Sequence, residues 1–372
     1  MNTASVDYLI FVEDPGAVNG VVGLPAVLQS RGTSFALAAT GHAVDYLTTL
    51  GIACDPVGPD ETASSLLSRY TPRGVLTGTS ENPDSLGLEL NKAAQKAKIP
   101  GVAFVDGPVS AEYRFRGRGD SPLAFAPDWV LAADANTGAL FREFGFAPDK
   151  LHVCGHPYMD HIRAMTERLD VEGQTNVRRR VLPNAPTDRP VWTFVAELSD
   201  GIAPERFHRN PNYTLRGRGN SDNRTDIVLD EVLDALGGIE PRPYIVLRLH
   251  PKNHAEEFAG YGAEIDHVSS GGLPSDLIYG TDLVIGMTSI LLTEAVVMGR
   301  PTVSVVPDPG EGAWLPNHGL IPVIHTRGDL RKLLSAALSD PTQLMGKPAT
   351  DVIKFGATDR MADFLLDLIA DQ

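Results

Sequence analysis

The 372-residue sequence contains few cysteines and few basic residues. Its two cysteines, Cys54 and Cys154, lie far apart, and they form neither a disulfide framework nor a zinc-binding spacing such as Cys-x-x-Cys. The 32 Lys and Arg residues are outnumbered by 47 Asp and Glu residues, which gives a formal net charge of −15. This excess of acid argues against sequence-independent binding of nucleic acid and against a basic helix on a membrane surface.

Long apolar runs and familiar catalytic motifs are also missing. No run of about 18 apolar residues occurs, so the sequence predicts no membrane-spanning segment. The opening residues MNTASVDYLIFVEDPG lack a basic region before their short apolar run, and they predict a first strand rather than a signal peptide. GxxxxGKS/T, GxSxG and HExxH are absent. We therefore expect a cytoplasmic enzyme or binding protein.

The residues that are present alternate between short apolar runs and helical stretches. We predict strands at 8–12, 34–39, 74–77, 102–105, 129–132, 151–154, 191–195, 244–249, 283–286 and 302–306. We predict helices at 21–30, 43–50, 85–98, 225–236, 290–298, 330–338 and 360–369. Strands separated by helices are typical of parallel βαβ units, so the fold class is α/β with doubly wound parallel sheets.

The length favours two domains, at about 100–200 residues for each. We expect a Rossmann-like domain at 1–156, a polar linker at 157–188 and a second Rossmann-like domain at 189–345. A C-terminal helix within 346–372 is expected to pack back on the first domain. The two domains should face each other across a cleft. Ligands of such sheets bind beyond the carboxyl ends of the strands, so the residues just after each strand carry the functional information.

The strongest of these signals is the sequence Arg248-Leu249-His250-Pro251-Lys252. Arg248, His250 and Lys252 alternate along a strand end, which places their side chains on one side. Three donors at the carboxyl end of an apolar, interior strand suit an anionic group. The alternative is an edge strand with solvated basic residues.

A second signal is the sequence Gly286-Met287-Thr288-Ser289, where a strand ends and a helix begins. The free N–H groups and partial positive charge of the helix N-terminus, with two hydroxyls beside it, suit a phosphate. The alternative is that Thr288 or Ser289 is only an N-cap. Glu294, one turn further, could hold a ribose diol or be a helix-surface residue.

Acidic residues follow two strands of the first half. Asp106 follows an apolar strand, where it could act as a base or form a turn before Gly107. Glu13 and Asp14 follow the first strand and are alternative candidates for the base. Their acidic loop could bind the acceptor or only form a turn. His156, in a second His-Pro pair, is interpreted as structural, because it lies at the predicted domain junction.

The frame Y-x-F/L-R-G-R-G-D/N occurs twice, at 113–120 and 213–220. Each copy follows an acidic strand-end loop, which in the second half includes Glu197. Arg-Gly-Arg-Gly is cationic and conformationally free, so we predict that these segments bind an acceptor or another anion. The alternative is chance similarity between Gly- and Arg-rich loops. The four arginines concerned are Arg116, Arg118, Arg216 and Arg218.

The strand-end residues resemble those of the GT-B glycosyltransferase superfamily. Bacterial CMP-sialic-acid transferases carry a D/E-D/E-G motif in the first domain and HP and S/T-S/T motifs in the second, and CDP-glycerol glycerophosphotransferases share the last two. His250-Pro251 and Thr288-Ser289 match these last two motifs, and Val105-Asp106-Gly107 matches the first in part. The run DLVIGMTSILLTEAVVMGRPTVSVV is more distantly similar to the nucleotide-binding helix of UDP-N-acetylglucosamine 2-epimerase.

The resemblance implies a metal-independent glycosyltransferase or polyol-phosphate transferase of bacterial glycan or glycoconjugate biosynthesis. It implies a CMP-, CDP- or UDP-linked donor in the second domain and a glycan, lipid-linked or small-molecule acceptor in the first. No cofactor is implied, because the donor is a substrate. No metal is implied, because the predicted cleft loops lack Asp-x-Asp and cationic side chains can replace the ion.

The resemblance also implies roles for individual residues. His250 would bind or protonate the leaving phosphate, and stabilising that charge is the main catalytic task. Asp106 would take the proton of the acceptor hydroxyl. The remaining donor-site residues would be Thr288 and Ser289 at the phosphate oxygens, Arg248 and Lys252 as added positive charge, Glu294 at the ribose and Gly286 at the strand end.

Two other readings stay open. One is a sugar-nucleotide epimerase or hydrolase of the same fold. The other is a non-catalytic protein that binds a nucleotide sugar. Fold analogy does not choose among them, because one fold hosts many activities.

Overall fold

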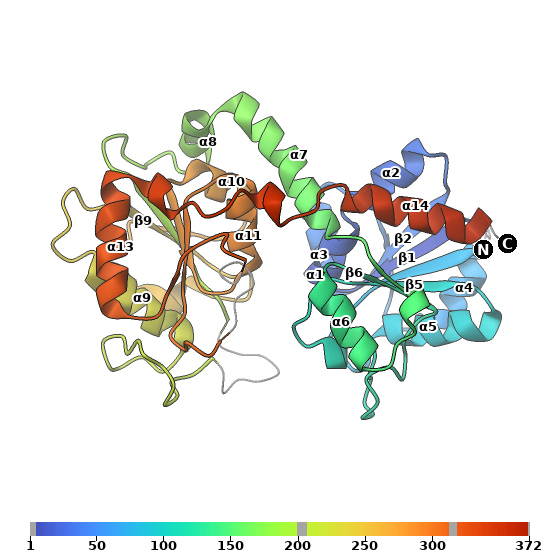
Figure 1. Cartoon of the computed structure of the whole chain (residues 1–372). Helices are drawn as coiled ribbons and strands as arrows, with labels where there is room; N and C mark the ends of the chain where they lie inside the picture. Colours follow the sequence, from blue (N-terminus) through green and yellow to red (C-terminus); the bar gives the residue numbers. More distant parts are fainter. Residues whose placement is uncertain (1–4, 199–206, 312–317, 371–372) are drawn as a thin grey trace. The chain divides into compact units, whose positions relative to one another are not determined.

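A computed structural model of the chain describes residues 5–198, 207–311 and 318–370 (Figure 1). The chain forms two compact units, one of residues 1–161 and 353–372 and the other of residues 162–352. The segment predicted as a linker contains two helices, α7 (Pro157–Glu172) and α8 (Gln174–Val181). The division between the units falls within α7.

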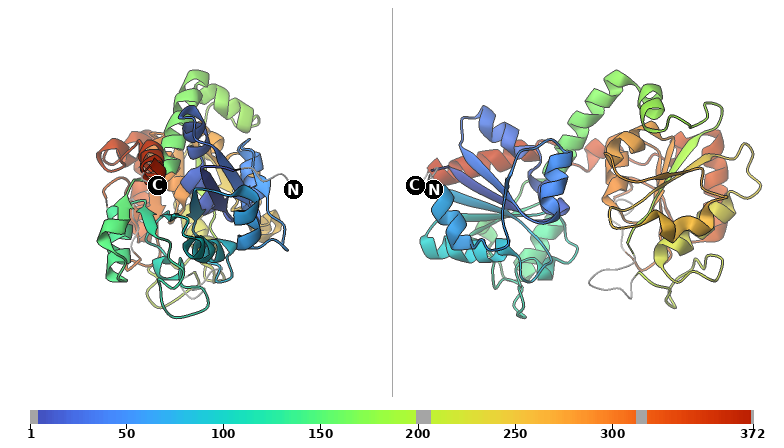
Figure 2. Two further views of the ribbon diagram at one scale, coloured as in Figure 1. Left: turned by 90° about the vertical axis from the view of Figure 1, so that its right-hand side faces the viewer. Right: turned by 180° about the vertical axis from the view of Figure 1, so that it is seen from behind.

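The first unit is built on a seven-stranded parallel sheet with the strand order β3-β2-β1-β4-β5-β6-β7. Its strands are β1 (Tyr8–Val12), β2 (Phe35–Ala39), β3 (Asp55–Pro56), β4 (Gly74–Gly78), β5 (Gly101–Val105), β6 (Trp129–Ala132) and β7 (Leu151–Val153). Its helices are α1 (Pro15–Val21), α2 (Leu24–Ser30), α3 (His42–Thr49), α4 (Ala63–Tyr70), α5 (Leu86–Ala97), α6 (Ala135–Glu143) and α14 (Ala357–Ala370). The sheet is doubly wound, with helices on both faces (Figure 2).

The C-terminal helix α14 packs on the first unit beside α2 (Figure 1). Met361 and Leu365 of α14 are fully buried in the core that β1 and α1 share. The Tyr8 hydroxyl donates to the Leu365 carbonyl at 2.6 Å. Asp160 of α7 accepts the N–H groups of Gly356 at 2.6 Å and Thr358 at 2.8 Å, which anchors the return of the chain into this unit.

The second unit has a six-stranded parallel sheet with the order β10-β9-β8-β11-β12-β13. Its strands are β8 (Val191–Val195), β9 (Tyr244–Arg248), β10 (His267–Ser269), β11 (Leu283–Gly286), β12 (Thr302–Val305) and β13 (Val323–Ile324). Besides α8, its helices are α9 (Arg224–Ala235), α10 (Pro274–Gly280), α11 (Ile290–Val297) and α13 (Arg327–Ser339). The strand order reverses between β8 and β11, which is where ligands of such sheets bind.

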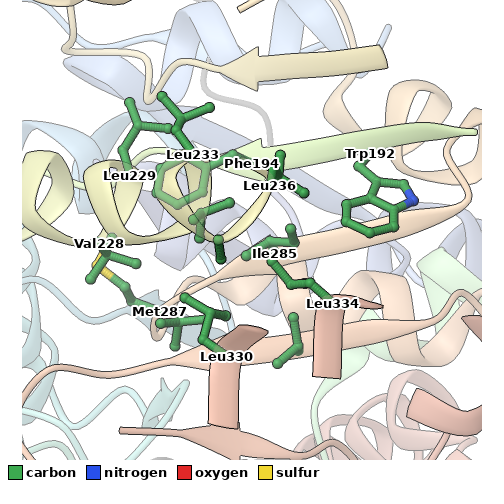
Figure 3. Close-up of a cluster of buried hydrophobic side chains, with 14 of the residues drawn as sticks. Trp192, Phe194, Val228, Leu229, Leu233, Leu236, Ile285, Met287, Leu330 and Leu334 are labelled. Carbon is green, nitrogen blue, oxygen red and sulfur yellow. The ribbon is translucent and has the colours of Figure 1, made fainter. Parts of the chain in front are cut away.

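The main core of the second unit lies between its sheet and helices α9 and α13 (Figure 3). Trp192 and Phe194 of β8 project into it together with Ile285 of β11, and each is at most 1% exposed. Met287, just after β11, is fully buried in the same core. The segments that follow β8 and β11 therefore begin at well-packed residues, and this packing fixes where their side chains lie.

Most predicted elements are present with shifts of at most three residues at their ends, and the predicted α/β class with doubly wound parallel sheets is confirmed. One helix differs in kind. The range 21–30, predicted as one helix, includes the last residue of α1, Val21, and the whole of α2. A break at Gly23 separates α1 from α2. Pro25 explains the break, because proline lacks an N–H and is tolerated only in the first turn of a helix, which is its place in α2.

Candidate functional site

Three neighbouring strands of the second unit, β9, β8 and β11, end next to one another. Glu197 follows β8, His250 follows β9 and Thr288 follows β11. Gly286 allows α11 to turn back closely over the sheet, because a Cβ at this position would lie 3.0 Å from the Leu292 side chain. This close return aims the N-terminus of α11 at the end of β8.

The N-terminus of α11 is filled by the carboxylate of Glu197. Glu197 Oε1 accepts the backbone N–H groups of Thr288 at 2.6 Å, Ser289 at 2.7 Å and Met287 at 3.3 Å. These three N–H groups are called the α11 cradle below. Glu197 Oε2 accepts the Thr288 hydroxyl at 2.9 Å and the Arg224 guanidinium at 3.0 Å. The cradle therefore binds an anion, but the anion is a side chain of the same chain.

Arg224 neutralises this carboxylate from below the surface. It is the first residue of α9 and is 1% exposed. Its guanidinium donates to Glu311 at 2.5 Å and to the Thr288 hydroxyl at 2.8 Å, in addition to Glu197. Burial raises the pKa of Glu311, and the Arg224 charge opposes this rise. One buried cation is thus shared by two carboxylates.

Ser289 caps α11, because its Oγ accepts the N–H of Leu291 at 3.2 Å. The alternative that one of the two hydroxyl residues is an N-cap is therefore correct for Ser289. The Thr288 hydroxyl instead lies between Arg224 and Glu197. The predicted role of both hydroxyls at a phosphate stays a prediction.

His250 lies near the same carboxylate. Its Nδ1 accepts the N–H of Lys252 at 3.2 Å, so the neutral ring carries its proton on Nε2. Burial lowers the pKa of His250, the Lys252 charge lowers it further, and the Glu197 carboxylate acts in the opposite direction. A neutral imidazole with an Nε2–H can donate a hydrogen bond to a phosphate oxygen.

The three basic residues of the Arg248–Lys252 segment do not act as one group. Arg248 is buried, and its guanidinium donates to the carbonyls of Gly271 at 2.5 Å and Gly272 at 3.3 Å and to Ser269 Oγ at 3.2 Å. It holds the loop after β10 and borders a cavity of about 430 Å³. Lys252 is exposed. The alternative of an edge strand is wrong, because β9 lies between β10 and β8.

Glu294 is fully buried in α11, so it is not a helix-surface residue. Burial lowers the pKa of Arg248, and the negative charge of Glu294 acts in the opposite direction. The two groups therefore interact electrostatically. Its predicted contact with a ribose stays a prediction.

In the first unit, Asp106 lies at the end of β5 with a cation beside it. Its Oδ1 is 3.2 Å from the Arg114 guanidinium. A Cβ on Gly16 would lie 3.0 Å from Asp106 Oδ2, so a larger residue at this position would crowd the carboxylate. Asp106 is thus positioned from two sides, by a loop arginine and by the start of α1.

Glu13 and Asp14 have different roles at the end of β1. Asp14 is the N-cap of α1, and its Oδ1 accepts the N–H of Ala17 at 3.0 Å, so its turn role is the one observed. Glu13 accepts the Ser85 hydroxyl at 2.5 Å. Burial raises the pKa of Glu13 above its ordinary value, although its hydrogen bonds act in the opposite direction. A half-buried carboxylate of this kind is a candidate base.

His156 is a residue that the sequence analysis interpreted as structural only. Its ring packs edge-on against Phe104 of β5 at a centroid distance of 5.4 Å. Burial lowers the pKa of His156, whereas the carboxylates of Asp106, Asp134 and Asp160 act in the opposite direction. His156 therefore belongs to the electrostatic surroundings of Asp106, at the carboxyl ends of β5, β6 and β7. The signal in the sequence was its position directly after a strand.

The two Arg-Gly-Arg-Gly segments share the backbone conformation of their first glycine but not that of their second, because Gly219 has a left-handed φ and Gly119 does not. Gly117 and Gly217 both have a left-handed φ, of 63° and 59°. The residues two positions before them, Phe115 and Leu215, are both buried. The structural similarity of the two copies is therefore limited to the buried apolar residue and the first glycine.

Each segment is also held by carboxylates of its own unit. Arg118 pairs with Asp84. Arg218 donates to Glu264 at 2.6 Å and 2.7 Å and to Asp234 at 3.0 Å. These pairs give two of the four arginines internal partners.

The other two arginines are placed differently. Arg116 stacks over the Tyr113 ring at 4.2 Å, and the backbone N–H of Arg216 donates to Glu231 at 3.0 Å. The anion-binding role of all four arginines, and the idea that the segments face each other, stay predictions.

Residues that sequence reasoning missed entirely include Arg224 and Glu311. Their pairing joins the start of α9 to a loop 87 positions away, and nothing in a local motif indicates it. Within the described ranges, no group of three or more His, Cys, Asp or Glu side chains is arranged to hold a metal ion. No helix among the described residues is long and apolar enough to cross a bilayer.

No protein-family model and no curated protein sequence matches this chain. Solved structures do resemble it. UDP-GlcNAc 2-epimerase from Methanocaldococcus jannaschii has a TM-score of 0.68 at 13% identity, covering 97% of this chain and 99% of that chain. The Neisseria meningitidis UDP-GlcNAc 2-epimerase bound to UDP-GlcNAc has a TM-score of 0.65 at 14% identity, covering 97% of this chain and 100% of that chain. A variant of the wall teichoic acid polymerase TagF has a TM-score of 0.62 at 15% identity, covering 100% of this chain and 90% of that chain.

The chain has a GT-B type fold. The fold predicted from the strand-end motifs is thereby confirmed, with two α/β units of parallel strands. The structural neighbours of this GT-B type chain are enzymes, and they include a polymerase and epimerases. At these low identities the likeness concerns the fold alone.

Proposed function

We propose that the chain is a metal-independent transferase that moves a glycosyl or polyol-phosphate group from a nucleotide-activated donor to a hydroxyl acceptor. The observation that carries the proposal is the α11 cradle. Three backbone N–H groups and a hydroxyl converge on one anion at the point where the strand order reverses. A donor of this class has a phosphate to place there, and the solved structures of similar fold include proteins named for UDP-GlcNAc and teichoic acid.

The second unit would hold the nucleotide. The leaving nucleotide gains negative charge as the bond to the transferred group breaks, so oriented N–H donors and a positive helix end lower the barrier. His250, with its proton on Nε2, would donate to the same phosphate. These contacts need no metal ion, because the donors of the cradle are already fixed by the fold.

The first unit would supply the base for the acceptor hydroxyl. Asp106 is the proposed base, and Glu13, whose pKa burial raises, is the alternative. A base that is held in place contributes about 10²–10⁴-fold to the rate. The donor, by contrast, would owe its affinity to the second unit.

Calorimetric titration with CMP, CDP, UDP and GDP, followed by an assay of nucleotide release, tests the proposal. We expect saturable binding of at least one nucleotide. We also expect release from CDP-glycerol or from a CMP- or UDP-linked sugar that rises when glycerol or a methyl glycoside is added as acceptor. Release that does not depend on an acceptor would instead indicate a hydrolase, and conversion of the sugar without release would indicate an epimerase.

A further inference from the structure

Every donor of the α11 cradle is already used by Glu197. The N–H groups of Thr288 and Ser289 donate to Glu197 Oε1 at 2.6 Å and 2.7 Å, close to the short end of N–H···O distances. The Thr288 hydroxyl and the Arg224 guanidinium donate to Oε2. A phosphate oxygen and this carboxylate therefore cannot occupy the cradle together.

The charges at the site lead to the same conclusion. The buried Arg224 guanidinium already lies between two carboxylates, Glu197 and Glu311, at 3.0 Å and 2.5 Å. A phosphate would add further negative charge to a site whose cation is already fully paired. Like charges repel at contact distance, so a phosphate in the cradle and the Glu197 carboxylate also oppose each other electrostatically.

We propose that Glu197 is an internal competitor that occupies the anion site of the chain and must be displaced before a phosphate binds. The affinity of the cradle for a phosphate is then reduced by the free energy that Glu197 gains by sitting there. Displacing Glu197 also frees a carboxylate at the end of β8. That the competing anion is a donor phosphate rests on the proposed function, whereas the competition itself does not.

The competition would give the site selectivity. A single weakly bound anion, such as inorganic phosphate, gains too little binding free energy to displace Glu197. A nucleotide donor makes further contacts through its base and sugar, and these contacts supply the energy for the displacement. The filled cradle thus discriminates against free phosphate without any contact to the nucleoside.

The test uses inorganic pyrophosphate as the probe and compares the full chain with Glu197→Ala. We expect Glu197→Ala to bind pyrophosphate about tenfold or more tightly than the parent chain in calorimetry, because the charge-assisted hydrogen bonds of the cradle become available. We also expect Glu197→Ala to melt at a lower temperature and to regain stability, saturably, when pyrophosphate is added. Equal pyrophosphate affinity of the two proteins, or binding by neither, overturns the proposal.

Two further variants keep the result interpretable. Glu197→Gln retains the size of the side chain but not its charge, so it should fold if Glu197→Ala does not, and it should also bind pyrophosphate more tightly than the parent. Glu311→Ala removes the other carboxylate from the same guanidinium but leaves the α11 cradle filled. If Glu311→Ala gains as much pyrophosphate affinity as Glu197→Ala, the removal of a nearby negative charge explains the gain, and the proposal is wrong.

The same titrations separate this proposal from the proposed function. If the parent chain binds a nucleoside diphosphate but Glu197→Ala binds pyrophosphate no better than the parent does, the transferase assignment stands and the competition is wrong. If Glu197→Ala gains pyrophosphate binding and no nucleotide binds either protein, the competition stands and the donor assignment is wrong.

Discussion

His156 and His250 hold their rings in the same way. Each follows a strand and precedes a proline, and in each the Nδ1 atom accepts the backbone N–H of the residue two positions later, at 3.2 Å. Both neutral rings therefore carry their proton on Nε2. One lies in each unit, so the two residues form a matched pair for testing which unit binds the nucleotide.

His250→Ala should weaken nucleotide binding. The loss of one charge-assisted hydrogen bond to a phosphate corresponds to roughly 1.5–3 kcal/mol, or about 10- to 150-fold in dissociation constant. Calorimetry on the nucleotide that binds the parent chain measures this directly. His156→Ala is the matched control and should leave the affinity unchanged. An unchanged affinity in His250→Ala would remove His250 from the donor site.

Stability should depend on pH through His156. Burial lowers its pKa in the folded chain below the ordinary value of 6.5, so the unfolded chain binds a proton more readily. The stability that neutral His156 contributes is present above about pH 6.5 and is lost as the pH falls below it. The melting temperature of His156→Gln should therefore fall less steeply than that of the parent between about pH 7.5 and pH 5.5. Parallel slopes would contradict this, and His42→Gln, at an exposed position, is the control.

Asp106→Asn should reduce turnover without changing nucleotide affinity. The variant keeps the size of the side chain and its contact with Arg114, but it cannot accept a proton. Loss of a general base costs about 10²–10⁴-fold in rate. The comparison is Glu13→Gln, assayed in the same way. If Asp106→Asn keeps its rate within a few-fold and Glu13→Gln loses activity, Glu13 is the base.

Gly117→Ala should destabilise the first unit by about 1 kcal/mol or more, because a left-handed φ is costly for alanine. In addition, the new Cβ would lie 2.6 Å from the Phe125 ring. Gly119→Ala is the control two positions later, where the φ is not left-handed and the nearest atom, a carbonyl oxygen, is 3.9 Å from the new Cβ. Urea unfolding should separate the two variants. Equal stability would mean that the repeated frame has no conformational requirement.

The sequence predicts the sheet strands well, because each buried parallel strand is a continuous apolar run that ends at a turn residue. β8 and β11 match the predicted bounds of 191–195 and 283–286. Short or amphipathic elements were missed. α4 begins at a capping box in which Ser65 takes the place of the usual Glu or Gln, so the pattern was not visible.

The candidate site was also predicted only in part, but the physical reason differs from that for the missed helices and strands. Strand-end positions follow from topology, so Asp106, His250 and Thr288 could be placed at carboxyl ends from the sequence. Side-chain partners depend on residues far apart in the chain. The carboxylate of Glu197 lies 2.6 Å from an amide 91 positions later, and no local pattern predicts that pair.

The most direct test of the central claim is a crystal structure of the chain with the nucleoside diphosphate that it binds most tightly in calorimetry. The account predicts a phosphate oxygen at the N–H groups of Thr288 and Ser289, within hydrogen-bonding distance of His250 Nε2, with the Glu197 carboxylate displaced from them. A nucleotide bound in the first unit, or one bound in the second unit away from the end of β11, would contradict it.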